Sequence, residues 1–216
     1  MLDIIVAGGW LMAPILVASA LALAIIIERL FSLRRGRIVP EGLLDRTWDQ
    51  IATHGLTAEA MHQLRHDSPL GRILATGLAA HNQSREVMKA SIEDTGRHVA
   101  HELERFLPTL GTIAAVTPLL GLLGTVVGMI EVFAVITEAG VGSPRDLAGG
   151  ISTALITTAA GISVAIPALV FHRYFRGLVD SLVLDMEREA LRLVEAVYGD
   201  VGHDQASVDS KAGAQR

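Results

Sequence analysis

Hydroxyl side chains within apolar stretches are the residues of this sequence that could do chemistry. Thr125 stands in an uncharged stretch at residues 106–130. A second uncharged stretch, residues 147–171, contains Ser152, Thr153, Thr157, Thr158 and Ser163. A hydroxyl both donates and accepts hydrogen bonds, so it can hold a chain of water or help to solvate an acid without burying a charge. The cluster predicts one polar path in the middle of a membrane.

A second interpretation stays open for each single hydroxyl. Ser and Thr in helices often donate to the carbonyl four residues earlier, which is ordinary helix packing. No acidic residue lies centrally in an apolar stretch, because Glu131 is near the outer end of the second one. A proton path normally needs an ionisable group, so a partner chain would have to supply it.

Other candidate sites are weaker. Histidine pairs with the spacing of helical metal ligands occur twice, as His62 with His66 and His98 with His101. No HExxH motif or cysteine accompanies them, so a metal site is not favoured. No nucleophile motif surrounds Ser152 or Ser163, and His172 is far along the helix from Ser163. We therefore expect no cofactor, no metal and no enzyme activity.

Glycines and small residues recur at helical steps in both stretches. Pro118, Gly121, Thr125 and Gly128 follow at steps of three and four, so they share one helix face. A smooth face of this kind lets another helix approach closely. The residues expected to shape the packing or the pore are Pro118, Gly121, Gly124, Gly128, Gly161 and Pro167.

Composition indicates a membrane protein with several spans. Half of the 216 residues are hydrophobic, the mean hydropathy is +0.44, and the charges are clustered. The absence of cysteine excludes disulfides, and a net charge of −5 with 4% aromatic residues argues against nucleic-acid binding. The first apolar stretch, most apolar over residues 11–27, ends in Glu28 and Arg29. Three spans follow from the three stretches.

Arginines predict the orientation of these spans. They follow the first span, precede the second and follow the third, at Arg34, Arg35, Arg37, Arg97, Arg105, Arg173 and Arg176. Because positive residues stay in the cytoplasm, the N-terminus is expected outside and the C-terminus inside.

The expected fold is all-α, with three membrane helices and extended cytoplasmic helical portions. Breakers at Pro40, Gly55 and Ser68-Pro69 divide the cytoplasmic part into short helices, which we expect to continue the ends of spans one and two without a separate soluble domain. The segments are an N-terminal segment with the first span (1–33), a cytoplasmic helical region (34–105), the second span (106–138), a short periplasmic loop (139–146), the third span (147–172), a cytoplasmic helix (173–198) and a disordered tail (199–216).

Two motifs resemble those of a known family. Thr117-Pro-Leu-Leu-Gly-Leu-Leu-Gly-Thr-Val-Val-Gly128 is similar to the second-span signature of the MotA/TolQ/ExbB proton-channel family. Gly150-Ile-Ser-Thr-Ala-Leu-Ile-Thr-Thr-Ala-Ala-Gly-Ile-Ser-Val-Ala-Ile-Pro-Ala168 is similar to its third-span signature. The span layout resembles the ExbB/TolQ branch over nearly the whole chain.

The resemblance implies a subunit of a homopentameric ring in the bacterial inner membrane. Its pore would hold the helices of an ExbD/TolR-like single-span partner, which supplies an aspartate, and the complex would use the proton-motive force to act on a TonB- or TolA-like protein. The family's pore threonines correspond to Thr125 and Thr158. Thr157 and Thr153 complete the expected ion-pathway residues. Surrounding membrane lipids are expected partners, and nucleic acid is not.

One position departs from the family pattern. Thr153 stands where many ExbB and TolQ proteins have a glutamate, five residues before the pore threonine. The change leaves open another subgroup, another partner or sodium in place of protons. An ExbB-like role in outer-membrane transport is preferred over a TolQ-like envelope role or a non-conducting helical scaffold.

Overall fold

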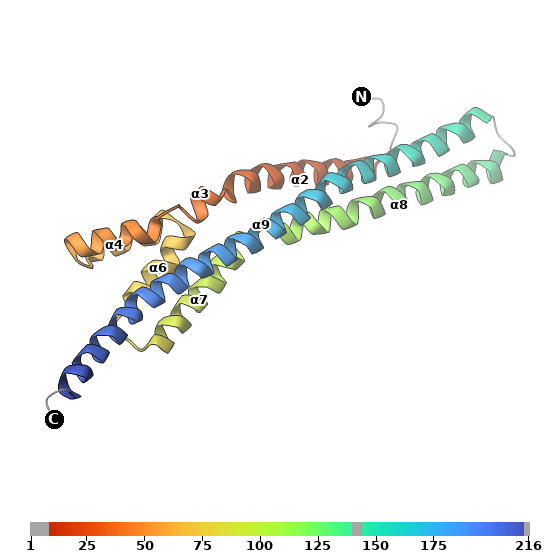
Figure 1. Ribbon diagram of the computed structural model, residues 1–216. Coiled ribbons are helices and arrows are strands. Elements are labelled where there is room, and N and C mark those ends of the chain that lie inside the picture. The colour runs from red at the N-terminus through yellow and green to blue at the C-terminus, as the bar shows by residue number, and fades with distance from the viewer. Residues whose placement is uncertain (1–8, 140–143, 214–216) are drawn as a thin grey trace. The chain divides into compact units, whose positions relative to one another are not determined.

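Helices are the regular elements of the computed structural model, which describes residues 9–139 and 144–213 (Figure 1). No strand occurs in these two ranges, so the all-α prediction is confirmed. In chain order the helices are α2 (Met12–Ser32), α3 (Arg35–Ile38), α4 (Leu43–His54), α5 (Ala58–Asp67), α6 (Pro69–Ala79), α7 (Arg85–Leu103), α8 (Leu107–Ala139) and α9 (Pro144–Gly213).

Three segments of the described chain each contain a helical stretch that is long and apolar enough to cross a membrane. These stretches lie within Met12–Ser32, Arg85–Ala134 and Ala148–Gly199, and an 18-residue window of each has a mean hydropathy of 2.1. Large apolar side chains point outward from α2, α8 and α9, for example Leu23, Leu119 and Leu155. Exposed apolar surface of this extent needs a partner or a lipid environment, which agrees with the three predicted spans.

The chain forms two compact units. The first comprises Met1–Phe31 and Phe106–Arg176, and the second comprises Ser32–Arg105 and Gly177–Arg216. Helix α9 therefore contributes residues to both units. The threonines and glycines selected from the sequence belong to the first unit.

The second unit has a buried core of its own. Seven of the 11 residues of α6 are buried, and α6 packs on both α5 and α7. Core side chains less than 2% exposed include Leu70, Leu74, Met88 and Val99, together with Leu182 and Leu193 of α9. The sequence pattern does not predict this core, because the core is assembled from short helices and a distant part of α9, each with weak periodicity of its own.

Turn and cap residues define the short helices as their types predict. Helix α4 ends at His54 and is capped by Gly55, whose φ is 73°. Thr57 caps α5 by accepting from the Ala60 amide at 3.2 Å. Ser68 caps α6 by accepting from the Gly71 amide at 3.0 Å, and Pro69 occupies the first helical position. The breakers at Gly55 and Ser68-Pro69 are thus confirmed.

Two features differ from the sequence prediction. Helix α9 continues to Gly213, although a disordered tail was expected from residue 199. Its polar composition suggested disorder, but residues 200–213 contain no proline to interrupt a helix that α9 has already nucleated. In addition, α7 ends at Leu103 and α8 begins at Leu107, so this span does not continue the helix before it. Residues 140–143 of the predicted loop and residues 214–216 lie outside the described residues.

Candidate functional site

Helices α8 and α9 pack through small residues in the first unit. A methyl group added at Gly161 of α9 would lie 2.5 Å from the Thr117 carbonyl oxygen and 3.2 Å from the Cα of Gly121. A methyl group added at Gly128 would lie 3.1 Å from the Cβ of Ala154. The contacts run in opposite directions along the two helices, so α8 and α9 are antiparallel. We call this contact the α8–α9 interface, and its glycines allow the two backbones to touch.

Thr158 connects the two helices directly. Its hydroxyl donates a hydrogen bond of 2.8 Å to the carbonyl oxygen of Gly121 on α8. A methyl group at Gly121 would lie 2.9 Å from the Cα of Thr158, so only glycine allows this approach without a shift. The side chain of Thr158 is half-buried.

Thr157 is enclosed in the same interface. It is 1% exposed, and its hydroxyl donates to the Thr153 carbonyl at 2.9 Å. A methyl group at Gly124 would lie 2.5 Å from its Cγ2 atom. The structure therefore brings Gly124 and Thr157 together, as it does Gly121 and Thr158.

Thr125 and Thr153 are half-buried, and each donates to its own helix. The Thr125 hydroxyl donates to the Leu122 carbonyl at 2.7 Å, and the Thr153 hydroxyl donates to the Gly149 carbonyl at 3.1 Å. When the proton of a hydroxyl is used in this way, the oxygen still has lone pairs to accept a hydrogen bond. Such oxygens can accept from water or from a protonated group, which is the chemistry that a cation or proton path requires.

The two prolines lie inside continuous helices. Helix α8 passes through Pro118, and α9 passes through Pro167. Each lacks the amide proton that would bond the carbonyl four residues earlier, so it weakens the helix at that point. Pro118 directly follows the buried Thr117, whose hydroxyl donates to the Ile113 carbonyl at 2.9 Å.

Residues of the weaker candidate sites have local contacts in the structure. Ser163 donates to the Ala159 carbonyl at 2.8 Å, while the Nδ1 atom of His172 lies 3.0 Å from the Leu107 carbonyl oxygen. The rings of His62 and His66 are close, with centroids 4.4 Å apart. Among the described residues, however, no group of three or more His, Cys, Asp or Glu side chains could hold a metal ion.

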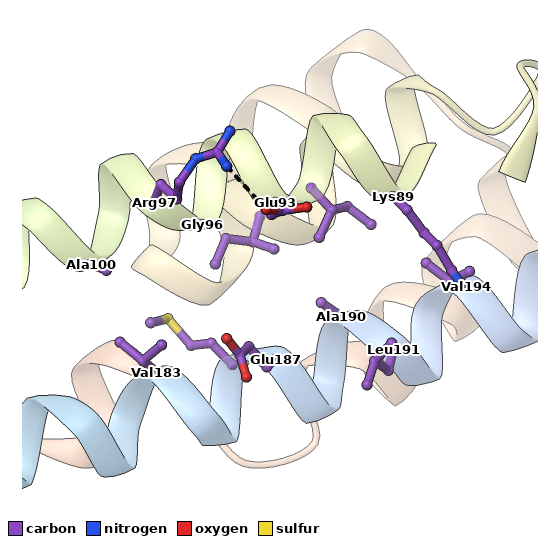
Figure 2. Close-up of a pocket in the computed structure, with 13 residues that line it drawn as sticks. Lys89, Glu93, Gly96, Arg97, Ala100, Val183, Glu187, Ala190, Leu191 and Val194 are labelled. Atoms are coloured by element: carbon purple, nitrogen blue, oxygen red, sulfur yellow. Dashed lines mark hydrogen bonds and ion pairs between the residues drawn. The ribbon is translucent and has the colours of Figure 1, made fainter. Parts of the chain in front are cut away.

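An apolar groove in the second unit was not found from the sequence. It has a volume of about 470 Å³ and lies between α7 and α9, with Lys89, Glu93, Arg97 and Glu187 among its charged lining residues (Figure 2). Arg97 donates to Glu93 at 3.0 Å. The small residues Gly96, Ala100 and Ala190 also line the groove.

A buried arginine lies in the last turn of α2. Arg29 is 4% exposed, and its guanidinium lies 5.5 Å from the centroid of the Phe106 ring. It also donates to both carboxylate oxygens of Glu28, with Nη2 2.8 Å from Oε1. The sequence signal was the charged pair directly after the first apolar stretch, but it did not reveal the aromatic partner beside the start of α8.

Comparisons with known proteins agree with the motifs of α8 and α9. A model of the MotA/TolQ/ExbB proton channel family matches residues 65–188. The ExbB-like 1 biopolymer transport protein of Synechocystis sp. is 33% identical over 207 residues, which cover 94% of this chain and 81% of that protein. Biopolymer transport protein exbB1 of Vibrio cholerae is 32% identical over 167 residues (74% and 72%). The Tol-Pal system protein TolQ of Pseudomonas aeruginosa is 26% identical over 183 residues (80% and 79%).

Proposed function

Because the chain belongs to the MotA/TolQ/ExbB proton channel family, we propose that it is an ExbB-like subunit that couples the proton-motive force to transport across the outer membrane. The family is one of transport complexes and channels, and the chain is a multi-pass inner-membrane member of it. The similarity to ExbB proteins over most of the chain is the observation that carries the proposal.

In the proposed complex, five copies form a ring around a single-span partner of the ExbD type. The partner contributes the protonatable aspartate, since the described parts of α8 and α9 hold no acidic residue between positions 107 and 130 or between 148 and 171. A TonB-like protein receives the mechanical output.

The proposed ion pathway runs past Thr125, Thr158 and Thr153. Their oxygens keep acceptor lone pairs after donating to backbone carbonyls, so they can stabilise a protonated water or the neutral form of the partner's aspartate. Thr157, which is 1% exposed, contributes by fixing the distance between the helices that carry the other three. Gly121, Gly124, Gly128 and Gly161 keep this distance short.

The proposal is tested by co-expression with the single-span protein encoded next to this gene, followed by gentle extraction and native mass spectrometry. A pentamer that carries the partner is the expected species. A monomer or dimer that does not bind the partner, under conditions that keep a known complex of this family intact, would contradict the proposed ring.

A TolQ-like role in envelope integrity is the second candidate, favoured by the similarity to TolQ of Pseudomonas aeruginosa over 80% of this chain. Deletion of the gene distinguishes the two roles. Loss of energy-dependent uptake with an intact envelope supports the ExbB-like role, whereas detergent sensitivity and periplasmic leakage with normal uptake support the TolQ-like one.

A non-conducting scaffold would conduct no protons in liposomes even with its partner present.

A further inference from the structure

Phe106 has a backbone conformation that phenylalanine rarely adopts. Its φ is 66°, and it is the one non-glycine residue with a positive φ in the part of the chain that the structure describes. In this region the Cβ atom crowds the neighbouring carbonyl, so glycine usually occupies such positions beside helix ends. A side chain that is held there against this preference indicates that its surroundings fix the conformation.

The conformation of Phe106 determines how α8 begins. Phe106 directly precedes Leu107, the first residue of α8, and its carbonyl accepts a 3.0 Å hydrogen bond from the Leu110 amide. The first turn of α8 is therefore built on the Phe106 backbone. A change in its φ and ψ would redirect that carbonyl and remove the bond.

Arg29 is placed to hold the Phe106 side chain. Its guanidinium carbon is 5.5 Å from the ring centroid. That separation is within the reach of a cation–π contact, which extends to roughly 6 Å. The arginine is 4% exposed, and low exposure to water strengthens the attraction between the charge and the ring. Glu28 accepts from two nitrogens of the same guanidinium, which fixes the orientation of its plane.

We propose that Arg29 is a positioning residue that keeps Phe106 in the left-handed conformation and thereby fixes the start of α8, the helix that carries Thr125. The functional part of this inference rests on the proposed function, in which Thr125 lies on the ion pathway. Without Arg29 the Phe106 backbone relaxes toward the common right-handed region, and the N-terminal end of α8 no longer has a fixed start. The start of α8 then no longer constrains the position of Thr125 relative to Thr158.

A double-mutant cycle tests the link between the two residues. Glycine adopts a positive φ without strain, so Phe106→Gly removes the need for a holding contact. The readout is amide hydrogen exchange over the first turn of α8, measured on the chain in its assembled complex. We expect Arg29→Ala to accelerate this exchange about tenfold in the natural sequence and less than about twofold in the Phe106→Gly background.

An equal acceleration by Arg29→Ala in both backgrounds, or none in the natural sequence, overturns the proposal. Arg29→Lys keeps a cation over the ring but loses the planar two-nitrogen contact with Glu28, so it should give an intermediate exchange rate. This variant should stay folded, and it replaces Arg29→Ala in the test if the alanine variant does not assemble.

Proton flux in liposomes, measured on the same four proteins with the partner, separates positioning from stability. Arg29→Ala should lower the proton flux in the natural sequence and should leave it unchanged in the Phe106→Gly background. The exchange measurement does not depend on transport activity. If the protein conducts no protons, the proposed function is contradicted, and hydrogen exchange alone still tests the link between Arg29 and Phe106.

Discussion

Thr158 is the residue at which helix packing and the proposed ion pathway meet. Its hydroxyl donates to the Gly121 carbonyl across the α8–α9 interface, and its oxygen keeps a lone pair for a water or a protonated group. Packing needs only the shape of the side chain, whereas the pathway needs the oxygen. Substitutions that preserve one and remove the other therefore distinguish the two roles.

Thr158→Val keeps the branched shape and removes the hydroxyl. Hydrogen bonds to charged groups are worth about 1.5–3 kcal/mol, so proton flux should fall by about tenfold to a hundredfold. Complex formation should persist, because interhelical hydrogen bonds in membranes contribute only about 0.6 kcal/mol on average. Flux in liposomes and native mass spectrometry measure the two quantities.

Thr158→Ser and Ser163→Ala are the matched controls. The first keeps the hydroxyl at the same place and should retain most of the flux. The second removes a hydroxyl on the exposed side of α9 that bonds only its own helix in the structure, so it should change little. Full flux through the Thr158→Val variant would remove this residue from the pathway.

The residue types select Thr125, Thr153, Thr157 and Thr158 as candidates, but they do not predict what each side chain contacts. Thr157 and Thr158 are adjacent in sequence, yet one is enclosed against Gly124 and the other bonds the Gly121 carbonyl. Neighbouring residues point in directions about 100° apart around a helix, and the exact facing of two helices depends on their packing rather than on either sequence alone. The conformation of Phe106 was equally inaccessible, because positive φ is normally signalled by glycine.

At the scale of elements, the closeness of α8 and α9 depends on glycines, of which Gly121 and Gly161 face the backbone of the other helix. Gly161→Ala places a methyl group 2.5 Å from the Thr117 carbonyl oxygen, and neither backbone can move away without separating the helices. Overpacking of this kind destabilises a protein by about 1–3 kcal/mol. We expect a lower midpoint of thermal unfolding in detergent and a smaller yield of assembled complex.

Gly149→Ala provides the comparison within the same helix. A methyl group there meets nothing within 4 Å. Alanine also favours helices over glycine by about 1 kcal/mol. The thermal midpoint of this variant should therefore equal or exceed that of the natural protein. If both substitutions lowered the midpoint equally, close approach at Gly161 would not be the cause.

The second unit offers an independent pair of glycines. Gly71 is buried in α6 and faces the Leu64 carbonyl oxygen, while Gly96 of α7 meets nothing within 4 Å and lines the groove. Gly71→Ala should destabilise this unit by about 1–3 kcal/mol. Gly96→Ala should stabilise it by up to about 1 kcal/mol, measured as hydrogen exchange of the α6 amides. Slower exchange in the first variant than in the second would contradict this interpretation of the core.

The existence of α5, α6 and α7 was accessible to sequence reasoning, whereas their common core was not. Thr57, Ser68 and Ser84 have the side chains that cap helices, and each accepts an amide hydrogen bond where its helix begins. The core depends instead on Leu182 and Leu193, which lie far along the chain from Met88 and its neighbours. No local pattern encodes contacts of that range.

At the scale of the whole molecule, orientation in the membrane remains a prediction from arginine. The charge bias places the N-terminus in the periplasm and the C-terminus in the cytoplasm, so residues 139–146 would face the periplasm and the second unit the cytoplasm. The opposite orientation would expose the second unit to the periplasm and would exclude the proposed output to a TonB-like protein.

The absence of native cysteine makes this prediction simple to test. In intact cells, Gly142→Cys should react with a maleimide that cannot cross the inner membrane, provided that the outer membrane is made permeable. Gln63→Cys, at an exposed position of α5, should react only after the inner membrane is opened, because the second unit is on the other side. The same labelling in detergent controls for the accessibility of each cysteine. Labelling of Gln63→Cys, but not of Gly142→Cys, in intact cells would show that the orientation is opposite to the predicted one. This result would hold whether or not the chain conducts protons.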